Sequence, residues 1–136
     1  MTFLPSQKFQ SISYPSHTVE RASRAICCAP FQLHLFKTMG EKSVFLGAIA
    51  SHPGFESGYT LKPLPESTAE NSLLWLIQVG VLRREVDGQG ITDSFRLTPL
   101  GRQLVEKFQQ QGDTLPLPSW RDRIYNTLSR WLRLPF

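Results

Sequence analysis

The residues of this 136-residue chain that could carry chemistry are two cysteines, three histidines and fifteen lysines and arginines. Cys27 and Cys28 are adjacent, so they cannot join distant segments through a disulfide, and such a pair suits a reducing, cytoplasmic compartment. They would act either as a thiol redox switch or, as the sequence favours, as small buried residues on a helix. His17, His34 and His52 lack the spacing to cysteines, histidines or carboxylates that is typical of a metal site.

The sequence contains no Ser-His-Asp arrangement, glycine-rich phosphate loop or pair of catalytic carboxylates. We therefore expect a protein that is not an enzyme and that holds no metal or cofactor. With 40% hydrophobic and 19% charged residues, the composition is that of a globular domain rather than a disordered chain. No run of about 18 apolar residues indicates a membrane span, and the N-terminus lacks the pattern of a secretion signal.

The net charge of +4 is unevenly distributed along the chain. Residues 67–108 hold five basic and five acidic side chains and are neutral. Residues 119–136 hold four arginines and one aspartate, which gives +3. The basic excess is therefore concentrated at the C-terminus.

Helical spacing of apolar residues predicts helices over 18–29 and 30–40 and, with Ser43 as its cap, a short helix over 44–50. Residues 51–66 contain three prolines and two glycines and predict a long loop. Such a loop would either bind a protein partner or pack over the core.

The next helix is predicted between a capping box, formed by Ser67 and Glu70, and Gly80. After it, "VLRREV" and "ITDSFRL" flank "DGQG" and predict two short strands joined by a tight turn, each with one buried face. Thr98 is expected to cap the following helix and Pro99 to occupy its first position.

The order of these elements, a series of helices followed by two strands and a further helix, is that of a winged helix-turn-helix. The stretch "GVLRREVDGQGITDSFRLTPLGRQLVE" resembles the wing and following helix of MarR- and PadR-type regulators. Phe95, Leu97, Thr98 and Gly101 fit the pattern hydrophobic-x-R-x...-Y/F-x-L-T-x-x-G that is common in those families. Independently of the resemblance, Gly101 would permit a close approach between its helix and a neighbouring backbone.

Over most of its length the chain also resembles a small family of cyanobacterial winged-helix proteins. The expected fold is mainly α with a small β-hairpin: a winged helix-turn-helix plus a C-terminal amphipathic helix. Its expected parts are an irregular arm over 1–16, the winged-helix domain over 17–108, a linker over 109–118 and the amphipathic helix over 119–136.

The resemblance implies that the helix before the hairpin enters the major groove of duplex DNA. The residues with suitable side chains for DNA contacts are Asn71, Gln78, Arg83, Arg84 and Arg96. However, the helix over 68–79 has no lysine or arginine, and the turn of the hairpin is acidic. The arginines would either contact DNA or form salt bridges with acidic neighbours on the hairpin.

Trp120, Ile124, Leu128 and Trp131 recur at helical spacing and should share one face of the last helix. This pattern favours docking on the chain's own domain or homodimerisation. Contact with a membrane surface is the second alternative, and contact with nucleic acid is the least favoured.

Two functions follow from these observations. One is a transcriptional regulator with weak intrinsic DNA affinity, favoured by the resemblance. The other is a winged helix used as a protein-interaction module without DNA binding, dimeric or peripheral to a membrane through its last helix. Fold alone does not decide between them. The regulator is the favoured prediction, because most such folds bind DNA, whereas the local charges argue against strong binding and favour the alternative.

Overall fold

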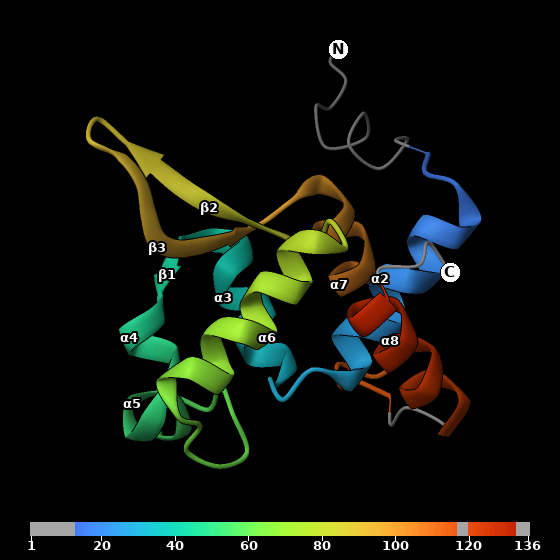
Figure 1. Cartoon of the computed structure of the whole chain (residues 1–136), viewed down its shortest axis with the longest axis horizontal. Helices are drawn as coiled ribbons and strands as arrows, with labels where there is room; N and C mark the ends of the chain where they lie inside the picture. The colour runs from blue at the N-terminus through green and yellow to red at the C-terminus, as the bar shows by residue number, and fades with distance from the viewer. Residues whose placement is uncertain (1–12, 117–119, 133–136) are drawn as a thin grey trace.

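The computed structural model describes residues 13–116 and 120–132 and is mainly helical, with one small antiparallel sheet (Figure 1). This arrangement confirms the predicted fold class of a mainly α protein with a small β-hairpin. The helices are α2 (Ser16–Cys28), α3 (Leu33–Glu41), α4 (Leu46–Ile49), α5 (Ser51–Glu56), α6 (Glu66–Gln78), α7 (Pro99–Gln110) and α8 (Trp120–Leu132). The strands are β1 (Val44–Phe45), β2 (Leu82–Asp87) and β3 (Gly90–Leu97).

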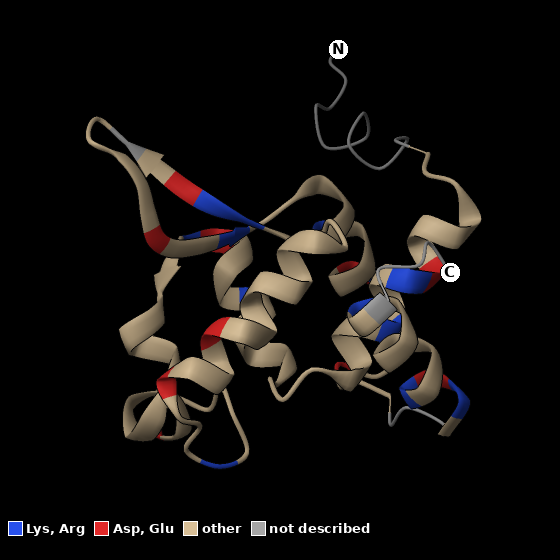
Figure 2. Ribbon diagram, viewed as in Figure 1, with Lys and Arg blue, Asp and Glu red and all other residues tan. Residues whose placement is uncertain are grey.

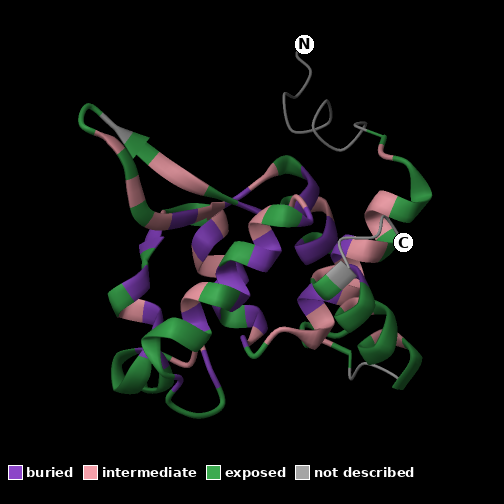
Figure 3. Ribbon diagram, in the orientation of Figure 1, coloured by how far each residue is buried: buried purple, intermediate pink, exposed green. Residues whose placement is uncertain are grey.

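The sheet has the strand order β1-β3-β2, and all its pairings are antiparallel. Phe95 lies at its centre, opposite Val44 on one side and Arg84 on the other. Strands β2 and β3 have the predicted buried face only where the sheet packs against the helices. Val86 and Ile91, near the turn, are exposed, because the hairpin projects beyond the body of the protein (Figures 1 and 3).

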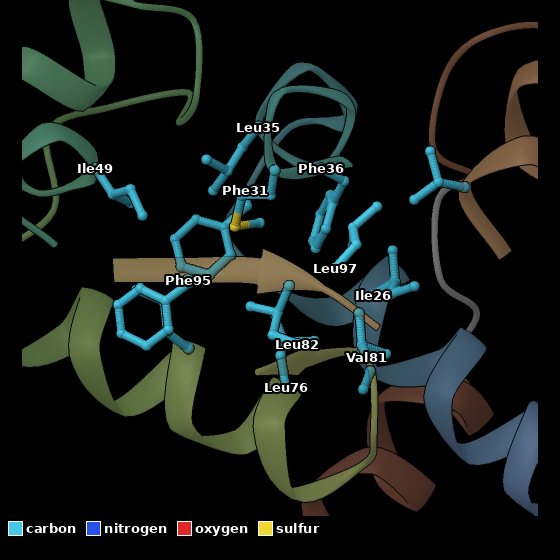
Figure 4. Close-up of a cluster of buried hydrophobic side chains, with 14 of the residues drawn as sticks. Ile26, Phe31, Leu35, Phe36, Ile49, Leu76, Val81, Leu82, Phe95 and Leu97 are labelled. Atoms are coloured by element: carbon cyan, nitrogen blue, oxygen red, sulfur yellow. The ribbon is translucent and has the colours of Figure 1, made fainter. Parts of the chain in front are cut away.

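The core lies between β3, α3 and α6 (Figure 4). Fully buried apolar side chains from these three elements, from α2, which closes one side, and from the start of β2 fill it. Prominent among them are Ile26, Phe36, Leu76, Val81, Leu82 and Phe95. Removing such side chains from water is the main force that stabilises a domain of this size.

A small set of hydrogen bonds connects the end of α6, both ends of the β2–β3 hairpin and the start of α7. Gly80 adopts a positive φ of 90°, and the Val81 N–H donates to Leu76 O, which ends α6 in a Schellman motif. Thr98 caps α7 as predicted, because its hydroxyl accepts from the Gly101 N–H at 3.0 Å. The same hydroxyl lies within hydrogen-bonding distance of the carbonyl oxygens of Gly80 and Val81.

The predicted close approach at Gly101 is also confirmed. A Cβ atom at this position would collide with the carbonyl oxygen of Val81. Glycine therefore allows α7 to lie directly against the start of β2.

The predicted loop over 51–66 is wrong in its first part, because residues 51–56 form α5. Pro53 is compatible with this helix, since the first turn needs no backbone donors. Gly54 lies so close to the backbone of Ile49 that no side chain would fit. Residues 57–65 remain a loop, which Thr60 ties to the core through a β-bridge with Phe31.

The predicted start of the second helix, at residue 30, is wrong because of the same β-bridge. The bridge to Thr60 holds Phe31 in an extended conformation, and α3 begins only at Leu33. The helix also continues through Gly40, which had been expected to end it, as far as Glu41.

Two predicted helix caps are also wrong. Ser43 caps no helix, since the next two residues pair with β3 as strand β1. α6 begins at Glu66, one residue before the expected capping box, so that Ser67 already lies within the helix. The linker begins later than expected, since α7 extends to Gln110.

Replacing Gly101 by alanine should lower the free energy of unfolding by on the order of 2 kcal/mol, because the new methyl group meets backbone that cannot move freely. This cost should exceed the gain in helix propensity, which is about 1 kcal/mol. Urea unfolding measures the difference. The control is Gly88→Ala, whose methyl group enters open space and should change stability by less than about 0.5 kcal/mol. Equal stabilities of the two variants would contradict this account.

Candidate functional site

The outward side of α6 carries Asn71, Leu74 and Gln78, which are all exposed. Their spacing of three and four residues places them on one face of the helix. No lysine or arginine occurs in α6, and its charged residues are the acidic Glu66 and Glu70 (Figure 2). This face of α6 therefore carries two amide side chains and one apolar side chain, and the N-terminal end of the helix is acidic.

The arginines of the hairpin are largely engaged with neighbouring acidic residues. Arg84 pairs with Asp93 at 2.8 Å, donates to the carbonyl oxygen of Thr92 at 3.2 Å, and lies 5.3 Å from the centroid of the Phe95 ring. Arg96 lies 3.6 Å from a carboxylate oxygen of Glu85. These pairs are the salt bridges that the sequence offered as the alternative to DNA contacts.

Arg83 differs from the other two, because its side chain is exposed on β2. None of the three arginines lines the groove beside Asn71 and Gln78 described below. The structure therefore separates the five candidate DNA-binding residues into two groups.

Helix α8 packs against α2 through its polar side (Figure 1). Ser129 is buried there, and the amide oxygen of Asn126 accepts from the indole nitrogen of Trp75 on α6 at 3.0 Å. The guanidinium of Arg24 on α2 lies 5.5 Å from the centroid of the Tyr125 ring. These contacts fix α8 to both α2 and α6.

The apolar side of α8 consequently points away from α2. Its residues Trp120, Ile124, Leu128 and Trp131 are all exposed, and the two tryptophans are the most accessible, at 69% and 77%. We call these four residues the outer face of α8. The predicted grouping on one face is therefore present, although the helix docks on its domain with the opposite face. The predicted cap of this helix, Ser119, lies outside the described residues.

A groove of about 470 Å³ runs between α6 and α8. Its lining residues are Asn71, Leu74, Trp75 and Gln78 from α6 and Arg130 and Trp131 from α8. Two candidate DNA-binding residues and one residue of the outer face of α8 thus meet at one site. Three lining residues, Leu74, Trp75 and Arg130, were not predicted as site residues, since only the docking of two distant helices brings them together.

The segment over 51–66 is mostly tied to the core. The backbone N–H of Gln32 donates to Tyr59 O at 2.8 Å, the Ser51 N–H donates to Leu64 O at 2.7 Å, and the Leu64 side chain is buried. Phe55 and Leu61 are exposed at its surface. It is therefore a packed segment with two exposed apolar side chains.

Both cysteines are free and partly buried on α2. Burial, with smaller effects from the neighbouring Cys28 thiol and from Asp122, raises the pKa of Cys27 to about 11. Burial likewise raises the pKa of Cys28. Since the thiolate is the reactive form, this environment does not activate either thiol.

Within residues 13–116 and 120–132, no cluster of three or more histidine, cysteine or acidic side chains could hold a metal ion. In the same ranges, no helix combines the length and hydropathy needed to cross a membrane.

The profile of the Npun_F0494-like family matches residues 12–130 of the chain. The chain belongs to this family. The match includes α8 as far as Arg130, so the docked helix lies within the region that defines Npun_F0494-like proteins rather than outside it. No curated protein and no solved structure matches the chain significantly.

At pH 8, alkylation of Cys27 should be at least about tenfold slower in the folded protein than in the urea-unfolded chain. The reason is that the thiol stays protonated in the folded protein. The pKa of the Cys27 thiol is higher in the folded than in the unfolded chain. The contribution of the protonated thiol to the free energy of unfolding should therefore be present below pH 9 and lost as the pH rises toward about 11. Mass spectrometry after timed iodoacetamide treatment measures the rate at each residue. Equal rates in the folded and unfolded states would show that the thiol is not protected.

Proposed function

We propose that the chain is a winged-helix protein that binds a segment of another protein in the groove between α6 and α8. The observation that carries this proposal is the composition of the groove. It combines the apolar side chains of Leu74, Trp75 and Trp131 with two amides and a single cation, Arg130.

The order of elements supports the winged-helix assignment. α3, β1 and the short helices α4 and α5 precede α6, which is followed by the hairpin β2–β3. The central position of β3 between β1 and β2 fits a wing whose first strand lies at the edge of the sheet. α6 then corresponds to the helix that such proteins insert into DNA.

The charges around α6 disfavour binding to duplex DNA. Affinity for duplex DNA comes largely from lysines and arginines that neutralise phosphates. α6 has neither, its first turn is acidic, and two of the three arginines on the hairpin lie beside carboxylates.

The position of α8 also disfavours insertion of α6 into DNA. The major groove is about 12 Å wide and admits one helix, whose diameter with side chains is about 10–12 Å. α8 is held beside α6 by the hydrogen bond between Trp75 and Asn126, and Trp131 forms the opposite wall of the groove. Insertion of α6 would require α8 to move away first.

The groove suits an amphipathic helical segment of a partner. Such segments bind grooves through apolar side chains spaced three or four residues apart. Leu74 and the two tryptophans would contact these side chains, and Arg130 would pair with a carboxylate at the border. The amides of Asn71 and Gln78 would accept or donate hydrogen bonds at the rim.

Selection from a displayed library of random helical peptides against the full-length protein tests this proposal. The selected peptides should combine apolar residues at helical spacing with an acidic residue. Leu74→Glu should weaken their binding by at least about tenfold, because it places a carboxylate in the apolar wall of the groove. The matched control is Ile91→Glu, an equally drastic change at the exposed hairpin that should leave peptide affinity unchanged.

Two results would contradict the proposal. One is that the selected peptides bind the Leu74→Glu variant as tightly as the wild type. The other is micromolar binding of a labelled random duplex in fluorescence anisotropy that collapses between about 50 and 200 mM salt and is weakened by Arg83→Ala. The second outcome would restore the DNA-binding regulator, which the exposed Arg83 favours.

A further inference from the structure

The outer face of α8 is an apolar surface that the domain leaves uncovered. The helix uses its polar side, with Asn126 and Ser129, to contact the domain. A surface helix of a globular protein normally turns its apolar face inward. The reversed orientation of α8 therefore leaves two tryptophans and two aliphatic side chains in contact with water (Figure 3).

Positive charge borders this face. Arg121 and Arg123 are exposed, and at 100° per residue they flank the outer face on its two sides. The guanidinium of Arg121 lies 5.7 Å from the centroid of the Trp120 ring. Asp122 is the one carboxylate between Trp120 and Trp131, and it lies on the docked side, where it raises the pKa of the cysteines on α2.

We infer that the outer face of α8 binds the surface of a membrane rich in anionic lipids, with the helix lying in the plane of the headgroups. Tryptophan and arginine each have a favourable location at that depth, the indole at the boundary of the acyl chains and the guanidinium beside phosphate. An amphipathic helix of this kind lies on a membrane without crossing it.

Charge complementarity favours an anionic membrane surface over a second copy of the chain as the partner of the outer face of α8. Pairing two outer faces would collect the exposed Arg121 and Arg123 of both copies at one interface, without a carboxylate on either face to offset them. Anionic headgroups supply the opposite charge along the whole length of the helix.

Co-flotation of the full-length protein with lipid vesicles tests this inference. The protein should float with vesicles of equal parts phosphatidylcholine and phosphatidylglycerol, and bind at least about tenfold more weakly to phosphatidylcholine alone. Raising the salt concentration should weaken the binding to the mixed vesicles, because salt screens exposed charges.

The informative variant is Trp120→Ser combined with Ile124→Ser, which should lower binding to the mixed vesicles by at least about tenfold. Neither residue lines the groove between α6 and α8, so peptide binding there should be unaffected and the two proposals fail independently. The control variant, Leu61→Ser combined with Ile91→Ser, removes two apolar side chains elsewhere that are more exposed than Trp120 and Ile124, and it should float like the wild type. Arg121→Gln combined with Arg123→Gln should abolish the preference for anionic vesicles.

Three outcomes would overturn the inference. The first is a wild-type protein that does not float with the mixed vesicles. The second is flotation that the Trp120→Ser/Ile124→Ser variant retains in full. The third is a dimer in analytical ultracentrifugation that this variant converts to monomers, which would assign the outer face to a second copy.

Discussion

The contact between α8 and the helical body determines what this protein presents to its surroundings. A buried serine and the hydrogen bond from the Trp75 indole to Asn126 hold α8 by its polar side. A partly buried hydrogen bond of this type contributes about 1 kcal/mol, and losing one partner costs more where the other remains unsatisfied. The orientation of α8 then fixes both the groove beside α6 and the exposed apolar face.

The same contact affects how the proposed winged-helix fold could be used. In a winged-helix protein that reads DNA, the helix before the wing needs a free outer side and nearby cations. In this protein α8 forms a wall beside α6, and Arg84 and Arg96 of the hairpin are held by carboxylates on neighbouring positions of the sheet. Exposed ion pairs add little to stability. Their effect here is to lower the positive potential of the hairpin.

Sequence signals that act within a few residues predicted some of the element boundaries. Thr98 and Pro99 located the start of α7, and Gly80 located the end of α6, because caps and glycines act on their immediate neighbours. Other local signals failed, namely the predicted caps at Ser43 and Ser67 and the predicted helix end at Gly40. Strand β1 was missed, since two residues such as Val44 and its neighbour become a strand only by pairing with β3.

The candidate site could be predicted only in part. The spacing of Asn71 and Gln78 placed them on one face of a helix, and the repeat in the last helix grouped its apolar residues. Which face of α8 would meet the domain depends on partners that lie about fifty residues away, as in the pair Trp75 and Asn126. An apolar stripe normally indicates the buried side, and in α8 that rule gives the opposite of the observed orientation.

The most direct test of this account is the accessibility of the two sides of α8. In a background of Cys27→Ala and Cys28→Ala, a single cysteine is introduced as Ile124→Cys or as Ser129→Cys, and its labelling by a maleimide is followed by mass spectrometry. The account predicts labelling of the Ile124→Cys variant at nearly the rate of an unfolded chain, and labelling of the Ser129→Cys variant at least roughly tenfold more slowly. The reverse order would show that α8 docks through its apolar face, and would contradict both the groove between α6 and α8 and the exposure of the outer face of α8.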